Sequence, residues 1–321
     1  MLLVLNGTET LDETALYCID QYIQTGGRVL FTAKGIKVDT GGTLQAVLVN
    51  DLGLLGMLSS YGVTVMPEIA MDRSALTMQY QTRASNGSVY IRLVRNPQWI
   101  RVLPENGNRE HPICAGFGGL DLYWASPLVL NPPESVEAVP LFTSTSEAWS
   151  MREDFHTNPE IPSLFEKDAA QTTGRKILGV CLSGIFPSWF RGRPKPISEF
   201  PIQALPDLPD IPKSARVIVI GETEFITSFL GVTGAQYNLD FLIQAADWLG
   251  NDDDITGIRS RLSQTGRLDL IIDPEKRAAA MGYSRFVNII LTPLFVILAG
   301  IVLAFYRKKK CSITQEKQDE I

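Results

Sequence analysis

The sequence lacks the motifs that nucleotide hydrolysis, zinc binding and nucleophilic catalysis require. No segment of its 321 residues matches the pattern G-x-x-x-x-G-K-[ST], the loop that binds nucleotide phosphates. The four cysteines are far apart and include no C-x-x-C pair of the kind that holds zinc. Only two histidines, His111 and His156, are present, and neither lies in a recognisable pairing with a nucleophile. We therefore expect no catalytic residues, no metal and no cofactor.

Positive charge is also scarce. The 29 basic and 35 acidic side chains leave a net charge of -6, spread along the chain. Binding to a nucleic-acid backbone normally requires a concentrated basic surface. We therefore expect no nucleic-acid partner. The hydrophobic content of 45% and charged content of 20% are those of a globular protein with one large domain or two smaller ones.

A long apolar run lies near the end of the sequence. Residues 286–306 read FVNIILTPLFVILAGIVLAFY, without a charged side chain. As a helix rising about 1.5 Å per residue, this run would span roughly 31 Å, the thickness of a bilayer's hydrocarbon core. Four basic residues follow at 307–310. The positive-inside rule then predicts a single-pass protein of the bacterial inner membrane, with a cytoplasmic tail at 307–321 and its bulk extracytoplasmic.

The beginning of the sequence does not fit that topology. The first ten residues, MLLVLNGTET, contain no charged region, long apolar run or cleavage site of an export signal. Residues 2–5 already read as a buried strand. Two interpretations reconcile the two ends: a fragment whose export signal lies upstream, or a tail-anchored protein with the opposite orientation. The strand at the very start favours the fragment.

Helices and strands alternate over residues 1–75. A strand at 2–5 precedes a helical apolar face that ends at Gly26-Gly27, and a strand follows at 28–33. This β-α-β order favours an α/β, Rossmann-like domain with a parallel sheet covered by helices. We expect this segment to be the first part of that domain, incomplete at its N-terminus.

The middle segment, residues 76–175, is rich in proline and in strand patterns. Two alternating runs, 77–83 and 88–95, flank Asn86-Gly87 and predict a β-hairpin. The α/β pattern returns over 176–250, with buried strands at 177–182 and 216–220 and a final helix capped by Asn238. Residues 251–285 are expected to be a stem that leads to the membrane helix.

Two glutamates are the candidate ligand-binding residues. Glu222 and Glu224 come just after the strand at 216–220. Open α/β sheets bind ligands at the carboxyl ends of their strands, which favours a ligand or ion contact. The alternative is that these carboxylates cap the turn that follows. Cys181 and Ser183 are the best candidates for a nucleophile, but the G-x-S-x-G elbow is missing around them.

Taken together and in order, several stretches resemble a known family, the extracytoplasmic auxiliary components of ABC-type transport systems, which includes the gliding-motility auxiliary protein GldG. The stretches are residues 16–31, 58–63, 111–113, 125–128, 141–144, 184–188, 216–225, 247–249 and 258–259. The resemblance implies a glutamine-amidotransferase-like α/β domain that serves as a non-catalytic platform. It also implies an ABC transporter permease and a separate ATPase subunit as partners, with the lipid bilayer around the anchor.

The sequence departs from this family at two points. It starts at what looks like the middle of the domain, and it has Glu222 and Glu224 where the family usually shows Asp. The leading hypothesis is therefore a non-catalytic, membrane-anchored auxiliary subunit that binds permease or ligand outside the cytoplasm. The alternatives are a membrane-tethered sugar or peptide sensor using Glu222 and Glu224, and an amidotransferase-like hydrolase around Cys181.

Overall fold

The computed structural model divides the chain into two compact units, Met1–Ser263 and Gln264–Ile321. In the first unit it describes residues 1–7, 10–40, 44–50, 53–83, 87–158, 165–166, 168–197, 205–227 and 234–250. In the second unit it describes five helical residues, which are Gly282, Tyr283, Arg285, Ile289 and Pro293. All elements discussed below belong to the first unit.

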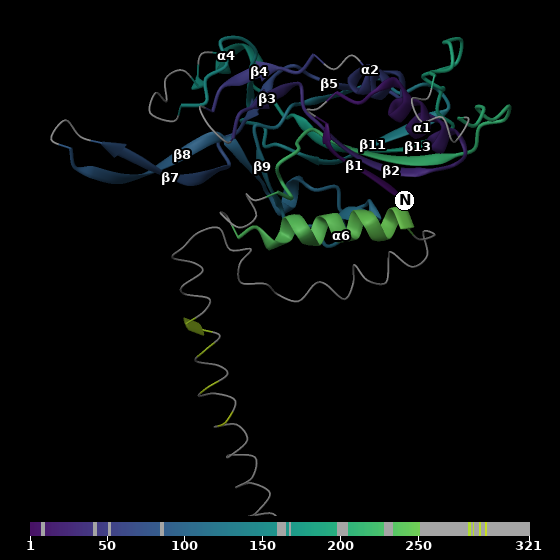
Figure 1. The fold of residues 1–321 in the computed structure, drawn as a ribbon. Helices are drawn as coiled ribbons and strands as arrows, with labels where there is room; N and C mark the ends of the chain where they lie inside the picture. The colour runs from purple at the N-terminus through teal and green to yellow at the C-terminus, as the bar shows by residue number, and fades with distance from the viewer. Residues whose placement is uncertain are drawn as a thin grey trace, which may run out of the picture. The chain divides into compact units, whose positions relative to one another are not determined.

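Seven strands of the described chain form the main sheet, in the order β1-β2-β14-β13-β10-β5, with β11 also paired to β13 (Figure 1). Their bounds are β1 Leu2–Gly7, β2 Arg28–Ala33, β5 Val63–Val65, β10 Leu128–Leu130, β11 Val136–Thr143, β13 Ile177–Gly184 and β14 Ala215–Ile220. Strands β1, β2 and β14 are parallel. Strand β13 is antiparallel to β14, to β11 and to β10, and β10 is antiparallel to β5. The sheet is therefore mixed.

This mixed sheet corrects the predicted fold class. A parallel-sheet, glutamine-amidotransferase-like domain was expected, and that prediction is wrong because β13 runs opposite to β14 over six residue pairs. Both strands are buried on their two faces, and such strands are continuous apolar runs whichever way they point. The strand positions were readable from the sequence, whereas the direction of β13 was not.

The predicted fold class also contained a transmembrane helix at residues 286–306. Apart from Ile289 and Pro293, that range lies outside the described residues, as do most of the predicted stem and the whole predicted tail. Among the residues that the structure does describe, no helix has both the length and the apolar character needed to cross a bilayer. The corrected fold class is a strand-rich α/β unit with a mixed sheet.

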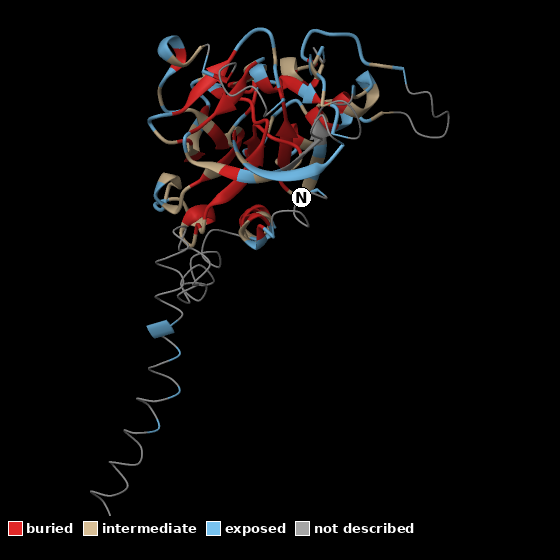
Figure 2. Ribbon diagram, turned by 90° about the vertical axis from the view of Figure 1, so that its left-hand side faces the viewer, coloured by how far each residue is buried: buried red, intermediate tan, exposed pale blue. Residues whose placement is uncertain are grey.

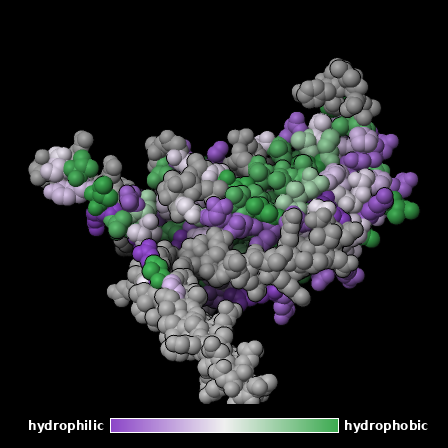
Figure 3. Space-filling view, turned by 90° about the horizontal axis from the view of Figure 1, so that it is seen from below, coloured by the Kyte–Doolittle hydropathy of each residue, from purple (hydrophilic) through white to green (hydrophobic). Residues whose placement is uncertain are grey.

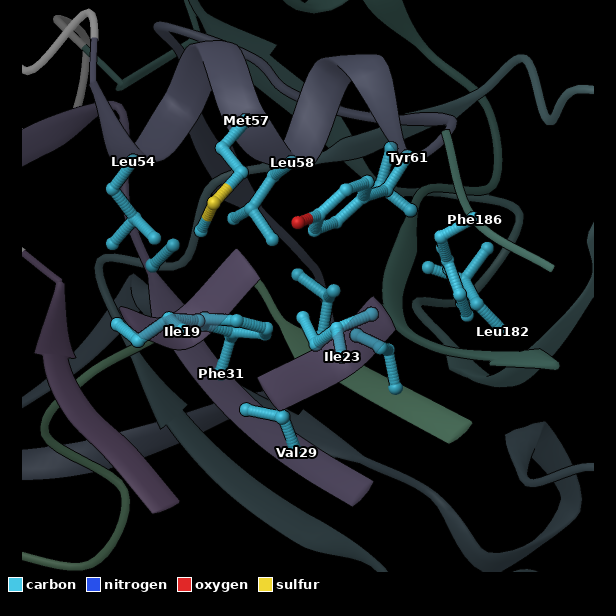
Figure 4. Close-up of a cluster of buried hydrophobic side chains, with 14 of the residues drawn as sticks. Ile19, Ile23, Val29, Phe31, Leu54, Met57, Leu58, Tyr61, Leu182 and Phe186 are labelled. Atoms are coloured by element: carbon cyan, nitrogen blue, oxygen red, sulfur yellow. The ribbon is translucent and has the colours of Figure 1, made fainter. Parts of the chain in front are cut away.

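Helices cover both faces of the main sheet (Figure 1). Helices α1, Glu13–Gln24, and α2, Leu54–Ser60, pack with one face, whereas α6, Gln236–Gly250, packs with the other. Successive strand residues point to opposite faces. Val29 and Phe31 of β2 accordingly lie in the first cluster and Leu30 in the second. Figure 4 shows side chains of α1 and α2 gathered with those of β2: Ile19 and Ile23 from α1, Leu54, Met57 and Leu58 from α2, and Val29 and Phe31 from β2.

Smaller sheets surround a third apolar cluster. The pairs are β3 Ile36–Val38 with β4 Ala46–Leu48, and β6 Ile69–Met71 with β12 Trp149–Met151. Strands β7 Ala75–Arg83, β8 Val89–Val102 and β9 Leu120–Tyr123 form a three-stranded sheet. The short helices are η1 Pro104–Asn106, η2 Pro112–Cys114 and α4 Ala169–Thr172. Trp99, Trp124 and Trp149 lie in the third cluster.

The predicted hairpin at 77–95 is confirmed by the antiparallel pairing of β7 with β8. Its turn, residues 84–86, lies outside the described residues. The hairpin projects from the rest of the unit (Figure 1), and Figure 2 shows buried residues concentrated in the sheets behind it. The predicted segment boundaries at 75, 175 and 250 stay predictions.

Candidate functional site

The two predicted glutamates lie where parallel strands β2 and β14 end side by side. The last pairs of this ladder join Phe31 to Val219 and Thr32 to Ile220. Lys34 follows β2 directly after Ala33, and Glu222 follows β14 after Gly221. The carboxyl ends of two neighbouring parallel strands thus bring together groups that are far apart in the sequence.

A buried lysine lies between the two carboxylates. Lys34 Nζ contacts Glu224 Oε2 and lies 3.8 Å from Glu222 Oε1. The side chains of Lys34 and Glu222 are fully buried, whereas that of Glu224 is slightly exposed. The hydroxyl of Thr223 also donates to Glu224 Oε2, at 2.9 Å. Sequence analysis missed Lys34, because no local pattern in the sequence shows that β2 and β14 are neighbours.

Glu222 also holds the turn that follows β14. Its Oε1 accepts a hydrogen bond from the Glu224 N–H at 2.6 Å, and its Oε2 accepts one from the Phe225 N–H at 2.5 Å. Phe225 is fully buried in the second apolar cluster. Glu222 therefore caps the turn that follows β14, which is the alternative role that the sequence suggested for these carboxylates.

The pKa values of the two glutamates are shifted in opposite directions. Burial raises the pKa of Glu222 well above its usual range, and the negative charge of Glu224 raises it further. Burial also acts to raise the pKa of Glu224, but hydrogen bonding with Glu222 and the charge of Lys34 together lower it. Of the two carboxyl groups, that of Glu224 is therefore the more acidic, and it forms the ion pair with Lys34.

Backbone segments close tightly around this cluster. The Ser126 N–H donates to Gly221 O at 2.7 Å, and a Cβ placed on Gly221 would lie 2.1 Å from Ser126 O. The Ser126 hydroxyl accepts from the Gly35 N–H at 2.9 Å and donates to Glu68 O at 3.0 Å. Gly221 is therefore required by close backbone approach. The arrangement places the ammonium group of Lys34 next to two carboxyl groups in a closely packed site.

The candidate nucleophiles lie on a strand rather than at a turn. Strand β13 extends to Gly184, so that Cys181 and Ser183 are both within it. Cys181 is buried in the second apolar cluster and is opposite Val139 and Ile218 in the ladders. Within the described part of the chain, no three His, Cys, Asp or Glu side chains are grouped to hold a metal ion.

His111 has a local structural contact. Its Nδ1 accepts a hydrogen bond from the Ile113 N–H at 3.3 Å, at the start of η2. Its ring centroid lies 5.2 Å from that of Trp248 on α6. These contacts give His111 a role in holding η2 and α6 together.

A second buried carboxylate, that of Asp20 on α1, joins three parts of the chain. Asp20 Oδ1 accepts from Tyr61 OH at 2.5 Å and from the Trp189 N–H at 3.2 Å. Its Oδ2 accepts from the Ser188 hydroxyl at 2.6 Å and from the Phe190 N–H at 3.4 Å. Burial, followed by the charge of Asp20, raises the pKa of Tyr61. Asp20 therefore fastens the segment after β13 to α1 and α2.

A third polar network joins α6 to β8 and β9. Arg101 donates from Nε and Nη2 to the two oxygens of Asp121, both at 2.9 Å, and Tyr237 OH donates to Asp121 Oδ2 at 2.7 Å. Asn238 pairs with the Asp121 backbone through its amide oxygen and nitrogen, both at 2.9 Å. The predicted helix-capping role of Asn238 is therefore wrong, because this residue lies inside α6 and holds the helix against β9.

A family model and a curated relative both match this chain. A family model described as "ABC-type uncharacterized transport system" matches residues 1–254. A curated protein from Borreliella burgdorferi (strain ATCC 35210 / DSM 4680 / CIP 102532 / B31), named "Uncharacterized protein", is 21% identical over 314 residues. That alignment covers 95% of this chain and 56% of the relative, so the chain spans little more than half of the relative's length.

Proposed function

The chain belongs to the family described as an ABC-type uncharacterized transport system, and from this membership we propose that it is a non-catalytic auxiliary subunit of an ABC transporter. In this proposal it binds the transporter's permease, and a separate subunit hydrolyses ATP. The match over residues 1–254 is the observation that carries the proposal, because it covers the whole main sheet and its helices.

The chemistry of the chain supports a binding role. ATP hydrolysis needs a phosphate-cradling loop, and no segment of the sequence supplies one. At the candidate site Lys34 is ion-paired with Glu224, and Cys181 is buried within a strand. Each of these features fits a protein that acts through its surface rather than by turning over a substrate.

The proposed location is the membrane, beside the permease, with the α/β unit on the extracytoplasmic side. The resemblance to the gliding-motility auxiliary protein GldG supports this side. Cys18 on α1 is exposed, whereas Cys114 and Cys181 are buried. In a C311S background, a membrane-impermeant maleimide should label Cys18 in intact spheroplasts if the unit lies outside. Labelling only after lysis would place the unit in the cytoplasm.

Co-purification tests the proposed partners. A tagged full-length chain, extracted from membranes in mild detergent, should recover a permease and an ATPase subunit in constant ratio. An untagged strain processed in parallel is the control. Repeated recovery of the chain without either subunit would contradict the proposal.

A second candidate function is a sugar or peptide sensor built on Glu222 and Glu224. One observation favours it: Lys34 and both carboxylates lie at the carboxyl end of neighbouring parallel strands, where α/β folds bind ligands. A thermal-shift screen with sugars and short peptides tests it. Stabilisation that is lost in E224A would support the sensor, and an unchanged melting temperature with every ligand would remove it.

A further inference from the structure

The projecting hairpin carries an unusual concentration of exposed apolar side chains. Four large ones lie within five consecutive positions of β8: Val89 is 56% exposed, Tyr90 52%, Ile91 64% and Leu93 72%. We refer to residues 89–93 as the apolar arm. Figure 3 shows hydrophobic and hydrophilic side chains next to each other on this projection, at the left of the view.

Both faces of the apolar arm are exposed. Because side chains alternate along a strand, Val89, Ile91 and Leu93 share one face, and Tyr90 and Arg92 share the other. All five residues are exposed, and none of them belongs to the three clusters of buried hydrophobic side chains. A strand of a soluble sheet normally packs at least one face against a core. The arm therefore packs into none of the three buried clusters of the described residues.

Among the described residues, the arm is also paired with a neighbouring strand along one edge only. The segment of β8 from Val89 to Arg95 pairs with β7, whereas β9 pairs with β8 only from Trp99 to Val102. One edge of the arm therefore has no strand partner among the described residues. Edge strands in soluble proteins usually carry charged side chains or proline that discourage pairing. Large apolar side chains at this position indicate contact with something outside the unit.

The charge of the hairpin is of one sign. Residues 74–104 contain no Asp or Glu, although the whole chain has a net charge of -6. Arg92 and Arg95 are exposed on the arm and just beyond it. Arg101, by contrast, is already bound to Asp121. The exposed end of the hairpin is thus both apolar and positively charged, within an acidic protein.

We propose that the apolar arm inserts into the interface of a phospholipid bilayer that contains anionic lipids. The aliphatic side chains would enter the boundary of the acyl chains, Tyr90 would lie at headgroup depth, and Arg92 and Arg95 would bind lipid phosphates. A lipid interface surrounds an inserted hairpin and so contacts both of its faces, whereas a flat protein surface covers only one. The free edge of β8 restricts insertion to this hydrated interface, because unpaired backbone groups are too costly in hydrocarbon.

This inference rests on the membrane location in the proposed function, but its test is independent of transporter partners. The full-length chain is prepared as C18S/C311S with one new cysteine, from I91C, that carries an environment-sensitive fluorophore. A matched control carries the label from I211C, a residue that is 81% exposed on another segment. Both proteins are reconstituted into vesicles of phosphatidylcholine alone or with phosphatidylglycerol, with or without brominated acyl chains. Because the readout is local, other segments that contact lipid do not affect it.

The label at 91 should shift to shorter wavelength and be quenched by brominated lipids, more strongly when phosphatidylglycerol is present. The label at 211 should respond to neither. The double variant R92Q/R95Q should lower the apparent lipid affinity of the arm about 25-fold, since each arginine near an anionic surface contributes about fivefold in affinity. Circular dichroism of each labelled protein establishes that it is folded.

An emission of the label at 91 that stays water-like with every vesicle would overturn the inference. The same holds if this label does not respond to lipid and a crosslinker attached at position 91 instead captures a co-purified permease, because the arm would then bind protein. In either case, co-purification of the transporter subunits would still test the proposed function separately. If co-purification fails, the fluorescence measurement still tests the lipid contact of the arm, because it does not depend on the transporter subunits.

Discussion

The ammonium group of Lys34 contacts the carboxylate of Glu224, 190 residues further along the chain, at the paired ends of β2 and β14. Glu222 Oε1 lies 3.8 Å from the same ammonium group, and the Glu222 carboxylate holds the turn after β14 through two backbone hydrogen bonds. This contact links the stability of the main sheet to pH, because three ionisable groups share one buried site.

Replacing Lys34 by methionine removes the cation that the structure places next to these two carboxylates. Breaking a buried pair in this way typically costs about 3–5 kcal/mol of unfolding free energy. The charge of Lys34 lowers the pKa of both glutamates, so without it the pKa of Glu222 rises further above its unfolded value, and that of Glu224, which burial also acts to raise, rises as well. Such groups lose stability as the pH rises through and beyond the unfolded pKa. Urea unfolding should therefore show a larger deficit for K34M at pH 8 than at pH 5.

The matched control for K34M is K37M, because Lys37 is exposed on β3. This variant should lose little stability at either pH. If the stability deficit of K34M were the same at pH 5 and pH 8, the charge of Lys34 would not control the pKa of the two glutamates.

Replacing Glu224 by glutamine should cost much less than replacing Lys34. Without the negative charge of Glu224, one cause of the raised pKa of Glu222 disappears, while Lys34 remains 3.8 Å away. Glu222 can then ionise and become the partner of Lys34. We expect a loss of about 1–2 kcal/mol, comparable to one charged hydrogen bond. Denaturant unfolding of E224Q and K34M side by side is the measurement, and equal losses would argue against this exchange of partners.

Removing the carboxylate of Asp20 should strongly destabilise the unit. In D20A, the buried hydroxyl of Tyr61 and the Trp189 N–H lose their acceptor, whereas the Phe190 N–H can still donate to the Ser188 hydroxyl at 3.2 Å. Leaving such donors unpaired costs about 1–3 kcal/mol each in buried sites, so that a total of about 2–6 kcal/mol is expected. Y61F removes one hydrogen bond and should cost about 1 kcal/mol. Thermal and urea unfolding would contradict this account if D20A were no less stable than Y61F.

The described cysteines should differ sharply in reactivity. Burial raises the pKa of the Cys114 thiol to about 12, and Cys181 is buried on β13. Since the thiolate is the reactive form, a maleimide at pH 8 should label Cys18 within minutes and should label the other two only after unfolding. Mass spectrometry of the C311S protein, native and denatured, measures this. Rapid labelling of Cys181 in the native protein would instead support an accessible, nucleophilic thiol.

The hydrolase alternative around Cys181 makes a separate prediction. If the thiol only packs within the second apolar cluster, C181A should leave transport-dependent growth unchanged and alter stability alone. C181S, which keeps a hydroxyl at this position, is the matched control. A loss of function in a folded C181A protein, without a loss of partner binding, would revive the hydrolase.

The sequence predicted where strands lie better than which way they run. Ile177–Gly184 and Ala215–Ile220 were recognised because their apolar runs are bounded by glycine and proline. Their antiparallel pairing escaped prediction, since full burial erases the alternation that separates the two faces of an antiparallel strand. The hairpin of β7 and β8 was predictable because its turn chemistry and alternation are local.

The candidate site shows the same division between local and long-range information. Glu222 and Glu224 were identified from their position after one strand. Lys34 was missed because its link to them depends on β2 and β14 being neighbours, which no local pattern encodes. Asn238 was misassigned for a similar reason: its side chain binds the backbone of Asp121, more than a hundred residues earlier, instead of capping its own helix.

ATP hydrolysis by the purified complex tests the central claim most directly. A complex isolated through the tagged chain is assayed before and after its partner subunits are stripped away. The account predicts hydrolysis in the intact complex, none in the stripped chain, and recovery of the activity in the partner fraction. Hydrolysis by the stripped chain, or a complex that never contains an ATPase, would contradict the assignment of this protein as a non-catalytic transporter subunit.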